Sequence, residues 1–149
     1  MSSILGVDPG THESGICLLS DGIVISSGVL PNDDVLRIVR DDRSDVLAIE
    51  KIVSYGSSVG QETFDTCVWI GRFLQAWGNP EDVMLIPRRK VKAHVCGPGK
   101  WGDPDVRKCL IAKLGAQGTK AAKGPTYGLK SHAWAACAVA VTAQHTLGE

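Results

Sequence analysis

Two carboxylates at the ends of apolar segments are the residues most able to do chemistry. Asp8 ends the run SILGVD, and Glu50 stands near the end of VLAIEK. An ionised carboxylate is costly to bury unless it is paired or bound to a metal. Each acid alone has a plain explanation, because Asp-Pro-Gly forms turns and a Glu at a strand end often faces solvent. On neighbouring strands of one sheet the two would repel each other. A divalent cation such as Mg²⁺ would relieve that repulsion and support phosphoryl chemistry.

A third titratable group, His132, stands near the start of the segment KSHAWAACAVAVTA. The small apolar side chains of segment 130–143 predict a helix that lies close against a sheet. His132 is then either a buried, hydrogen-bonded histidine or a metal ligand brought to the two acids. The segment alone leaves both interpretations open.

The elements that must position these groups alternate along the chain. The first thirty residues predict three antiparallel strands, with Asp21-Gly22 as a hairpin turn. Strands are predicted at 45–52 and 82–87, with Val46, Ala48 and Glu50 on one face of the first. Helices are predicted at 32–43, 61–77 (ended by Gly78-Asn79-Pro80), 105–115 (with Asp103 as its N-cap) and 130–143. No helix or strand is predicted for residues 88–102, which form a basic stretch. Residues 116–128 are predicted to be a mobile loop.

This order predicts an α/β fold with a five-stranded mixed sheet, in which an antiparallel meander of three strands is joined by two parallel strands and flanked by helices. The 149 residues favour a single domain spanning 1–149. Hydrophobic residues make up 44% and charged residues 21%, as in ordinary globular proteins. No apolar run approaches the roughly 20 residues of a membrane span, so no membrane partner is expected.

The cysteines and the N-terminus favour a cytoplasmic protein. The five cysteines lack any C-x-x-C spacing, so we expect reduced, mostly buried thiols and no zinc site. The first residues, MSSILGVDPG, do not have the pattern of a signal peptide.

Charge is strongly polarised although the net charge is zero. Residues 1–82 hold 13 acidic and 5 basic side chains, and residues 83–149 hold 3 acidic and 11 basic ones. Such a chain can present a basic face to a polyanion and keep a separate acidic site. Two solvated faces that cancel in space would explain the same distribution equally well.

An ordered set of motifs resembles the RuvC-type Holliday junction resolvases, most closely their bacteriophage-type members, within the ribonuclease H-like superfamily. The set spans nearly the whole chain. It comprises LGVDPGTHESG, LAIEKIVSYG, VGQETFDTCVWIGRFLQAWG, IPRRKVKAHVCG, DPDVRKCLIAKLG and YGLKSHAWAACAVAVTA. The first motif also occurs in actin-like kinases and YqgF-type nucleases, so the resemblance depends on the ordered set.

The resemblance implies that Asp8, Glu50 and His132 are catalytic metal ligands for Mg²⁺, for which Mn²⁺ would substitute. The family pattern at the last helix is Asp/His-x-x-Asp, and its second position falls on Ala135, which has no ligand atom. A second ion would then depend on substrate phosphate and water, or on an acid from elsewhere. Asp103 and Glu62 are the candidates for that acid.

The same resemblance implies roles for the basic residues. Lys92 matches the lysine of the Pro-x-x-Val-Lys segment and would act near the scissile phosphate. Tyr55 would stack on unpaired bases, or else it is an ordinary exposed loop tyrosine. The phosphate contacts expected from the basic face come from several residues: Arg88, Arg89, Lys90, Lys92, Lys100, Lys120 and Lys123.

The helix predicted at 61–77 is more apolar than one buried face requires. The family uses this helix in a twofold interface, so a homodimer is expected, although packing under loops of a monomer would also explain the excess.

The expected activity is therefore a Mg²⁺-dependent endonuclease that cuts branched DNA such as a four-way junction. A branched-DNA-binding protein with weak or no cleavage and a YqgF-like ribonuclease remain as alternatives.

Overall fold

The protein, described here as a computed structural model, is seen over residues 2–148. Its centre is a five-stranded sheet in the order β3-β2-β1-β4-β5. The strands are β1 (Ser3–Asp8), β2 (Glu13–Ser20), β3 (Ile23–Pro31), β4 (Val46–Lys51) and β5 (Val83–Pro87). Strands β1, β2 and β3 pair antiparallel, while β4 is parallel to both β1 and β5. The predicted mixed sheet is confirmed.

The predicted hairpin turn lies between β2 and β3. Asp21 and Gly22 both have positive φ, 52° and 79°. This is the backbone that a two-residue turn needs to match the twist of its strands, and it explains the Asp-Gly pair.

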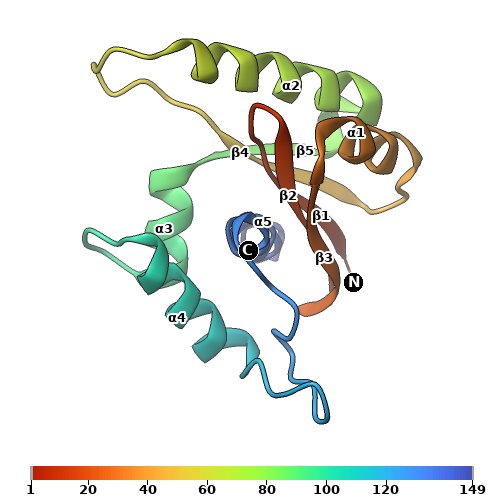
Figure 1. Cartoon of the computed structure of the whole chain (residues 1–149), viewed down its shortest axis with the longest axis vertical. Helices are drawn as coiled ribbons and strands as arrows, with labels where there is room; N and C mark the ends of the chain where they lie inside the picture. The colour runs from red at the N-terminus through yellow and green to blue at the C-terminus, as the bar shows by residue number, and fades with distance from the viewer. Residues whose placement is uncertain (1, 149) are drawn as a thin grey trace.

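Helices cover both faces of the sheet (Figure 1). On one face, α1 (Asn32–Asp41) and α2 (Gln61–Trp77) pack over a core that includes Leu5, Val7, Leu47 and Ile49. On the other face, α5 (His132–Leu147) packs with α3 (Arg88–Cys96) and α4 (Asp103–Leu114). The alternation predicted for β4 is confirmed, since Val46 and Ala48 belong to the core of the α5 face.

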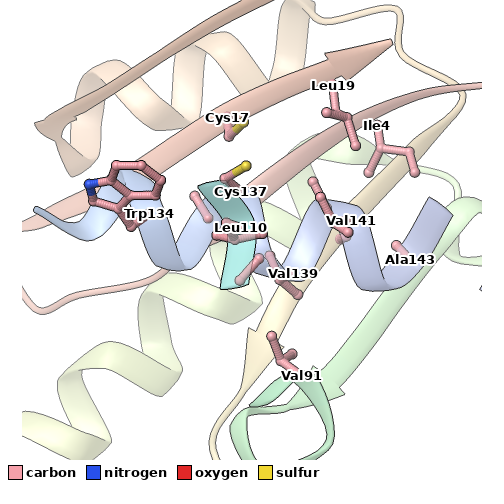
Figure 2. Packing of buried hydrophobic residues seen from close by; sticks show 14 of the residues in the cluster. Ile4, Cys17, Leu19, Val91, Leu110, Trp134, Cys137, Val139, Val141 and Ala143 are labelled. Carbon is pink, nitrogen blue, oxygen red and sulfur yellow. The ribbon is translucent and has the colours of Figure 1, made fainter. Parts of the chain in front are cut away.

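Two glycines let α5 approach the sheet closely. A Cβ added at Gly6 of β1 would overlap the carbonyl oxygen of Ala136 and lie 2.9 Å from Cβ of Ala140. A Cβ at Gly15 of β2 would overlap the carbonyl oxygen of His132. The small residues of α5 thus place its first turn directly against β1 and β2. Figure 2 shows the core beneath this helix, where Cys17 of β2 lies near Cys137 of α5.

The basic stretch forms a helix, α3, that the sequence analysis did not predict. Pro87 precedes it, Val91 and Val95 are buried one turn apart, and Gly97 with φ 87° ends it. These signals are present in the sequence, but two apolar positions within nine residues are a weak helical pattern.

Three other expectations need correction. Gly102, not Asp103, is the N-cap of α4, because the carboxylate of Asp105 accepts the N–H of Gly102 at 2.9 Å. Helix α5 begins at His132 and continues to Leu147, beyond the predicted end. Among the cysteines, which are all free, only Cys17 and Cys137 are buried.

The segment 116–128, expected as a mobile loop, folds back on itself through backbone hydrogen bonds. Gly124 donates to Gln117 at 2.9 Å, and Gly118 bridges Lys123. Thr126 is fully buried and its hydroxyl donates to the carbonyl of Gly115 at 2.8 Å. Within residues 2–148, none of the helices combines the length and apolar character required to cross a bilayer.

Candidate functional site

Strand register brings Asp8 and Glu50 together. Strands β1 and β4 run parallel with Gly6 opposite Ala48 and Val7 opposite Ile49, so the next position sets Asp8 beside Glu50. Side chains alternate along each strand, and Gly6 and Ala48 face α5. Asp8 and Glu50 therefore lie on the α5 face as well. The structure thus places the two acids side by side on neighbouring strands, the arrangement for which the sequence analysis considered a divalent cation.

A buried hydrogen-bond network fixes the turn that follows Asp8. The hydroxyl of Ser14 donates to Oδ1 of Asn32 at 2.6 Å and accepts the N–H of Gly10 at 3.1 Å. The amide of Asn32 donates to the carbonyl of Gly10 at 2.8 Å. Ser14 and Asn32 are both buried, so this turn is held rigidly at the end of β1. The sequence analysis did not identify this supporting pair.

Burial raises the pKa of both acids. The side chains of Asp8 and Glu50 are only 11% and 14% exposed. Burial raises the pKa of Asp8, although the nearby His132 and Arg88 oppose this shift. Burial together with the charge of Asp8 raises the pKa of Glu50 to about 7. A cation bound between these acids would favour their ionised forms and offset both the burial and the repulsion.

His132 meets Asp8 at the start of α5. Its Nδ1 lies 3.0 Å from Oδ2 of Asp8, and its side chain is 62% exposed. The buried interpretation of His132 is therefore wrong. The ring joins the acidic pair at its open side, where it is able to orient the carboxylate or to bind a cation itself.

Arg88, predicted only as a phosphate contact, spans the acidic site. Its Nη1 lies 3.6 Å from Oε1 of Glu50, and its Nη2 donates to Oδ1 of Asp103. Although burial acts to raise the pKa of Asp103, the cations Arg88 and Lys92 lower it. Arg88 is the first residue of α3 and directly follows β5, whose Ile86 pairs with Glu50. Because α3 begins directly after β5, the guanidinium of Arg88 lies close to the acids at the end of the neighbouring strand.

A pocket of about 620 Å³ opens beside these groups. Asp8, Arg88, Asp103, His132 and Ala135 all line it. Ala135 lies three residues after His132, on the same face of α5, and contributes only a methyl group. Asp103, one of the two candidate acids for a second ion, therefore lies in the same pocket as Asp8.

Glu62 occupies a different place. It lines a second pocket together with His132 and Gly10. The two candidate acids therefore flank His132 from different pockets.

The side chain of Lys92 points to the loop between α3 and α4. Its Nζ donates to the carbonyl of Trp101 at 3.1 Å and lies 3.6 Å from Oδ1 of Asp103. The indole of Trp101 in turn donates to the carbonyl of Gly97 at 2.8 Å. Lys92 thus holds this loop as well as adding positive charge near the acids.

The remaining predicted phosphate contacts lie on the surface. Arg89 stacks on Tyr55, with its Cζ 4.0 Å from the ring centroid, and Tyr55 is 56% exposed. Lys123 lies 5.3 Å from the ring of Tyr127. Lys90, Lys100 and Lys120 are exposed.

The donor set fits one divalent cation. Asp8 and Glu50 supply neighbouring oxygens, and Mg²⁺ is commonly held by one or two carboxylates together with water and substrate phosphate. Within residues 2–148 no cluster of three or more His, Cys, Asp or Glu side chains is arranged to hold a metal. Ala135, which lines the same pocket as Asp8, has no donor atom in its side chain.

No protein-family model matches the sequence, and no curated protein matches it. Solved structures do. A Thermus thermophilus RuvC in complex with Holliday junction substrate matches with a TM-score of 0.75 and 17% identity, covering 99% of this chain and 95% of that one. A Thermus thermophilus RuvC structure matches with a TM-score of 0.72 and 19% identity, covering 98% and 96%. Because both matches run almost end to end, the fold of this chain is that of the RuvC-type resolvases, within the ribonuclease H-like architecture.

Proposed function

We propose that this protein is a divalent-metal-dependent endonuclease that cuts branched DNA, with the four-way Holliday junction as its substrate class. The observation that carries the proposal is the pair of buried acids, Asp8 and Glu50, at adjacent strand ends on the α5 face of a RuvC fold. The junction bound by the similar Thermus thermophilus protein supports the substrate class.

Asp8 and Glu50 would hold the cation, with His132 at the open side of the site. Mg²⁺ or Mn²⁺ bound there would polarise a phosphate oxygen and lower the pKa of a water molecule. In the proposed hydrolysis the water oxygen bonds to phosphorus and the P–O3′ bond breaks. The departing O3′ takes a proton, so the products carry a 5′-phosphate and a 3′-hydroxyl. Lys92, whose Nζ lies 3.6 Å from Oδ1 of Asp103, would add positive charge that offsets negative charge on the phosphate.

The DNA would lie over α3 and the adjacent loops. Arg89, Lys90, Lys100, Lys120 and Lys123 would contact phosphates, which adds affinity without sequence information. The exposed ring of Tyr55, backed by Arg89, would stack on an unpaired base at the branch point.

A homodimer would present two sites to the two symmetry-related strands of a junction. Support comes from α2, where Phe64 and Val68 are 55% and 62% exposed although both are large and apolar. A neighbouring pocket of about 490 Å³, lined by Leu74, Val83 and Leu85 among others, would receive apolar side chains of a second copy.

The test is cleavage of a synthetic four-way junction with labelled strands, in Mg²⁺ and in Mn²⁺. We expect wild type to nick the junction, and Asp8→Asn to bind it with unchanged affinity but to cut at least about 10³-fold more slowly. Asp33→Asn, an exposed carboxylate at the start of α1, is the matched control and should cut normally. An Asp8→Asn variant that cuts at the wild-type rate would refute the proposed chemistry.

Ala135 gives a specific reason to keep a second candidate, a junction-binding protein with little or no cleavage. Titration of the protein with Mn²⁺ separates the two candidates. Binding in the micromolar to low millimolar range supports the nuclease, whereas tight junction binding without metal binding or cleavage supports the binding protein.

A further inference from the structure

Arg88 occupies an unusual position for a surface arginine. It is bracketed by acids from two elements, Glu50 of β4 at 3.6 Å and Asp103 of α4, with which it forms a hydrogen bond. Its side chain is 46% exposed, and it lines the pocket of about 620 Å³. These two contacts hold the guanidinium beside the acidic site.

The charges around the pocket indicate what Arg88 does there. The ionised acids Asp8, Glu50 and Asp103 face the cations Arg88 and Lys92, and these five groups sum to one negative charge. One divalent ion would change this sum to one positive charge, which a single phosphate charge neutralises, whereas two ions would leave three positive charges. Ala135, in the same pocket, offers no ligand that would hold a second ion.

We propose that Arg88 is a built-in second cation: its guanidinium supplies the positive charge that a second metal ion would otherwise provide, so the site works with a single divalent ion. This inference rests on the proposed nuclease function. Arginine suits the role because it stays charged at all relevant pH values and presents a planar fork of donors to phosphate oxygens. With Nη2 engaged by Asp103 and Nη1 beside Glu50, the group is oriented before substrate arrives, which is the condition for stabilising developing charge.

The first experiment counts ions. Wild type, Arg88→Ala and Arg88→Lys are titrated with Mn²⁺ and followed by electron paramagnetic resonance and calorimetry. We expect wild type to bind one Mn²⁺ per chain. We expect Arg88→Ala to bind Mn²⁺ about fivefold more tightly, because a repelling charge beside Glu50 is gone. Arg88→Lys, which keeps the charge, should bind Mn²⁺ as wild type does.

The second experiment measures cleavage of the four-way junction. We expect Arg88→Ala to cut about 10²–10³-fold more slowly in spite of its tighter metal binding. Millimolar guanidinium added to the reaction should restore part of this rate. A thermal melt of each variant shows whether it is folded.

Two control variants distinguish the proposed role of Arg88, a cation within the acidic site, from that of an ordinary phosphate contact. Arg89→Ala, on the neighbouring residue, should weaken junction binding and leave Mn²⁺ affinity unchanged. Arg37→Ala, an exposed arginine paired with Asp34 on α1, should change neither property.

Two ions bound to wild type, unchanged Mn²⁺ affinity in Arg88→Ala, or full cleavage by that variant would each overturn the inference. Absence of cleavage by wild type would instead refute the proposed function, and the Mn²⁺ titrations would still decide the role of Arg88.

Discussion

Asp8 and His132 are 124 residues apart in the sequence, and Nδ1 of His132 lies 3.0 Å from Oδ2 of Asp8. This contact depends on Gly15, because any side chain there would collide with the carbonyl of His132 and lift the start of α5 from the sheet. The residues next to Asp8 and His132 in the sequence carry no local signal that specifies this contact. The contact is a property of how closely α5 packs.

The first prediction concerns the imidazole itself. His132→Ala should lower junction cleavage and Mn²⁺ affinity by about 10–100-fold, as expected for a group that binds or orients a metal ligand. Its side chain is mostly exposed, so the melting temperature should stay close to that of wild type. His132→Asp, which supplies an oxygen donor in place of the imidazole nitrogen, should keep Mn²⁺ affinity closer to that of wild type than His132→Ala does. Normal cleavage by His132→Ala would exclude this role.

The second prediction concerns pH. The pKa of Glu50 is raised from 4.5 to about 7 in the metal-free fold, so between these values the folded state holds a proton that the unfolded state has lost. This group therefore destabilises the protein as pH rises through that window, and the effect is complete above pH 7. Glu50→Gln removes the ionisation and should be the more stable protein at pH 8, by on the order of 2 kcal/mol.

The measurement for Glu50 is urea unfolding of both proteins in EDTA, at pH 4.5 and pH 8. The difference in unfolding free energy should be larger at pH 8, whereas Mn²⁺ should stabilise only wild type. An equal difference at both pH values would contradict the raised pKa.

The third prediction tests the close packing of α5. Gly6→Ala would force a methyl group into the backbone of Ala136, which should destabilise the protein by about 1–3 kcal/mol or more. The same shift would move His132 away from Asp8 and reduce cleavage. Gly28→Ala in β3 is the matched control, since nothing lies within 4 Å of a Cβ there. Equal stability of the two variants in urea would show that α5 packs less closely than described.

The fourth prediction concerns the basic face. Lys90→Ala should weaken junction binding at low salt and reduce the slope of log affinity against log salt by about one. Arg43→Ala, an exposed arginine just after α1, removes the same charge away from α3 and should leave the slope unchanged. Fluorescence anisotropy at several salt concentrations measures both. A slope that Lys90→Ala leaves unchanged would exclude a phosphate contact at this position.

The fifth prediction concerns assembly. Val68→Glu should convert a dimer into a monomer, because it would bury a charge in the apolar α2 face. Ile25→Glu, on an exposed position of the edge strand β3, is the control and should leave the dimer intact. Light scattering after size-exclusion chromatography gives both masses. A wild-type monomer at all concentrations would refute the dimer.

Much of the fold follows from local signals in the sequence. Asp21-Gly22 predicts the hairpin, Gly78 the end of α2, and the alternation around Glu50 its position on one face of the sheet. These features depend on backbone sterics and on periodicity within a few residues, which a sequence displays directly. The two acids were identified for the same reason, since Asp8 ends an apolar strand and Glu50 lies one residue before the end of another.

What the sequence could not reveal are contacts between elements distant in the chain. Helix α3 was missed because only Val91 and Val95 mark its buried side, and its stability comes from packing on the rest of the core. Arg88 stood among other basic residues in the sequence, with nothing to distinguish it from Arg89. One residue of α3 reaches Glu50 and the next reaches Tyr55, because consecutive side chains on a helix point about 100° apart.

The sequence by itself therefore determined the strands, the helices other than α3 and the two carboxylates, because each depends on local backbone preference and hydrophobic pattern. Only the tertiary structure decided that His132 meets Asp8 and that Arg88 lies between Glu50 and Asp103. Those contacts require the close approach of α5 at Gly6 and Gly15, and the placement of α3 and α4 around it. Packing of the whole core fixes these distances, and no single segment encodes them.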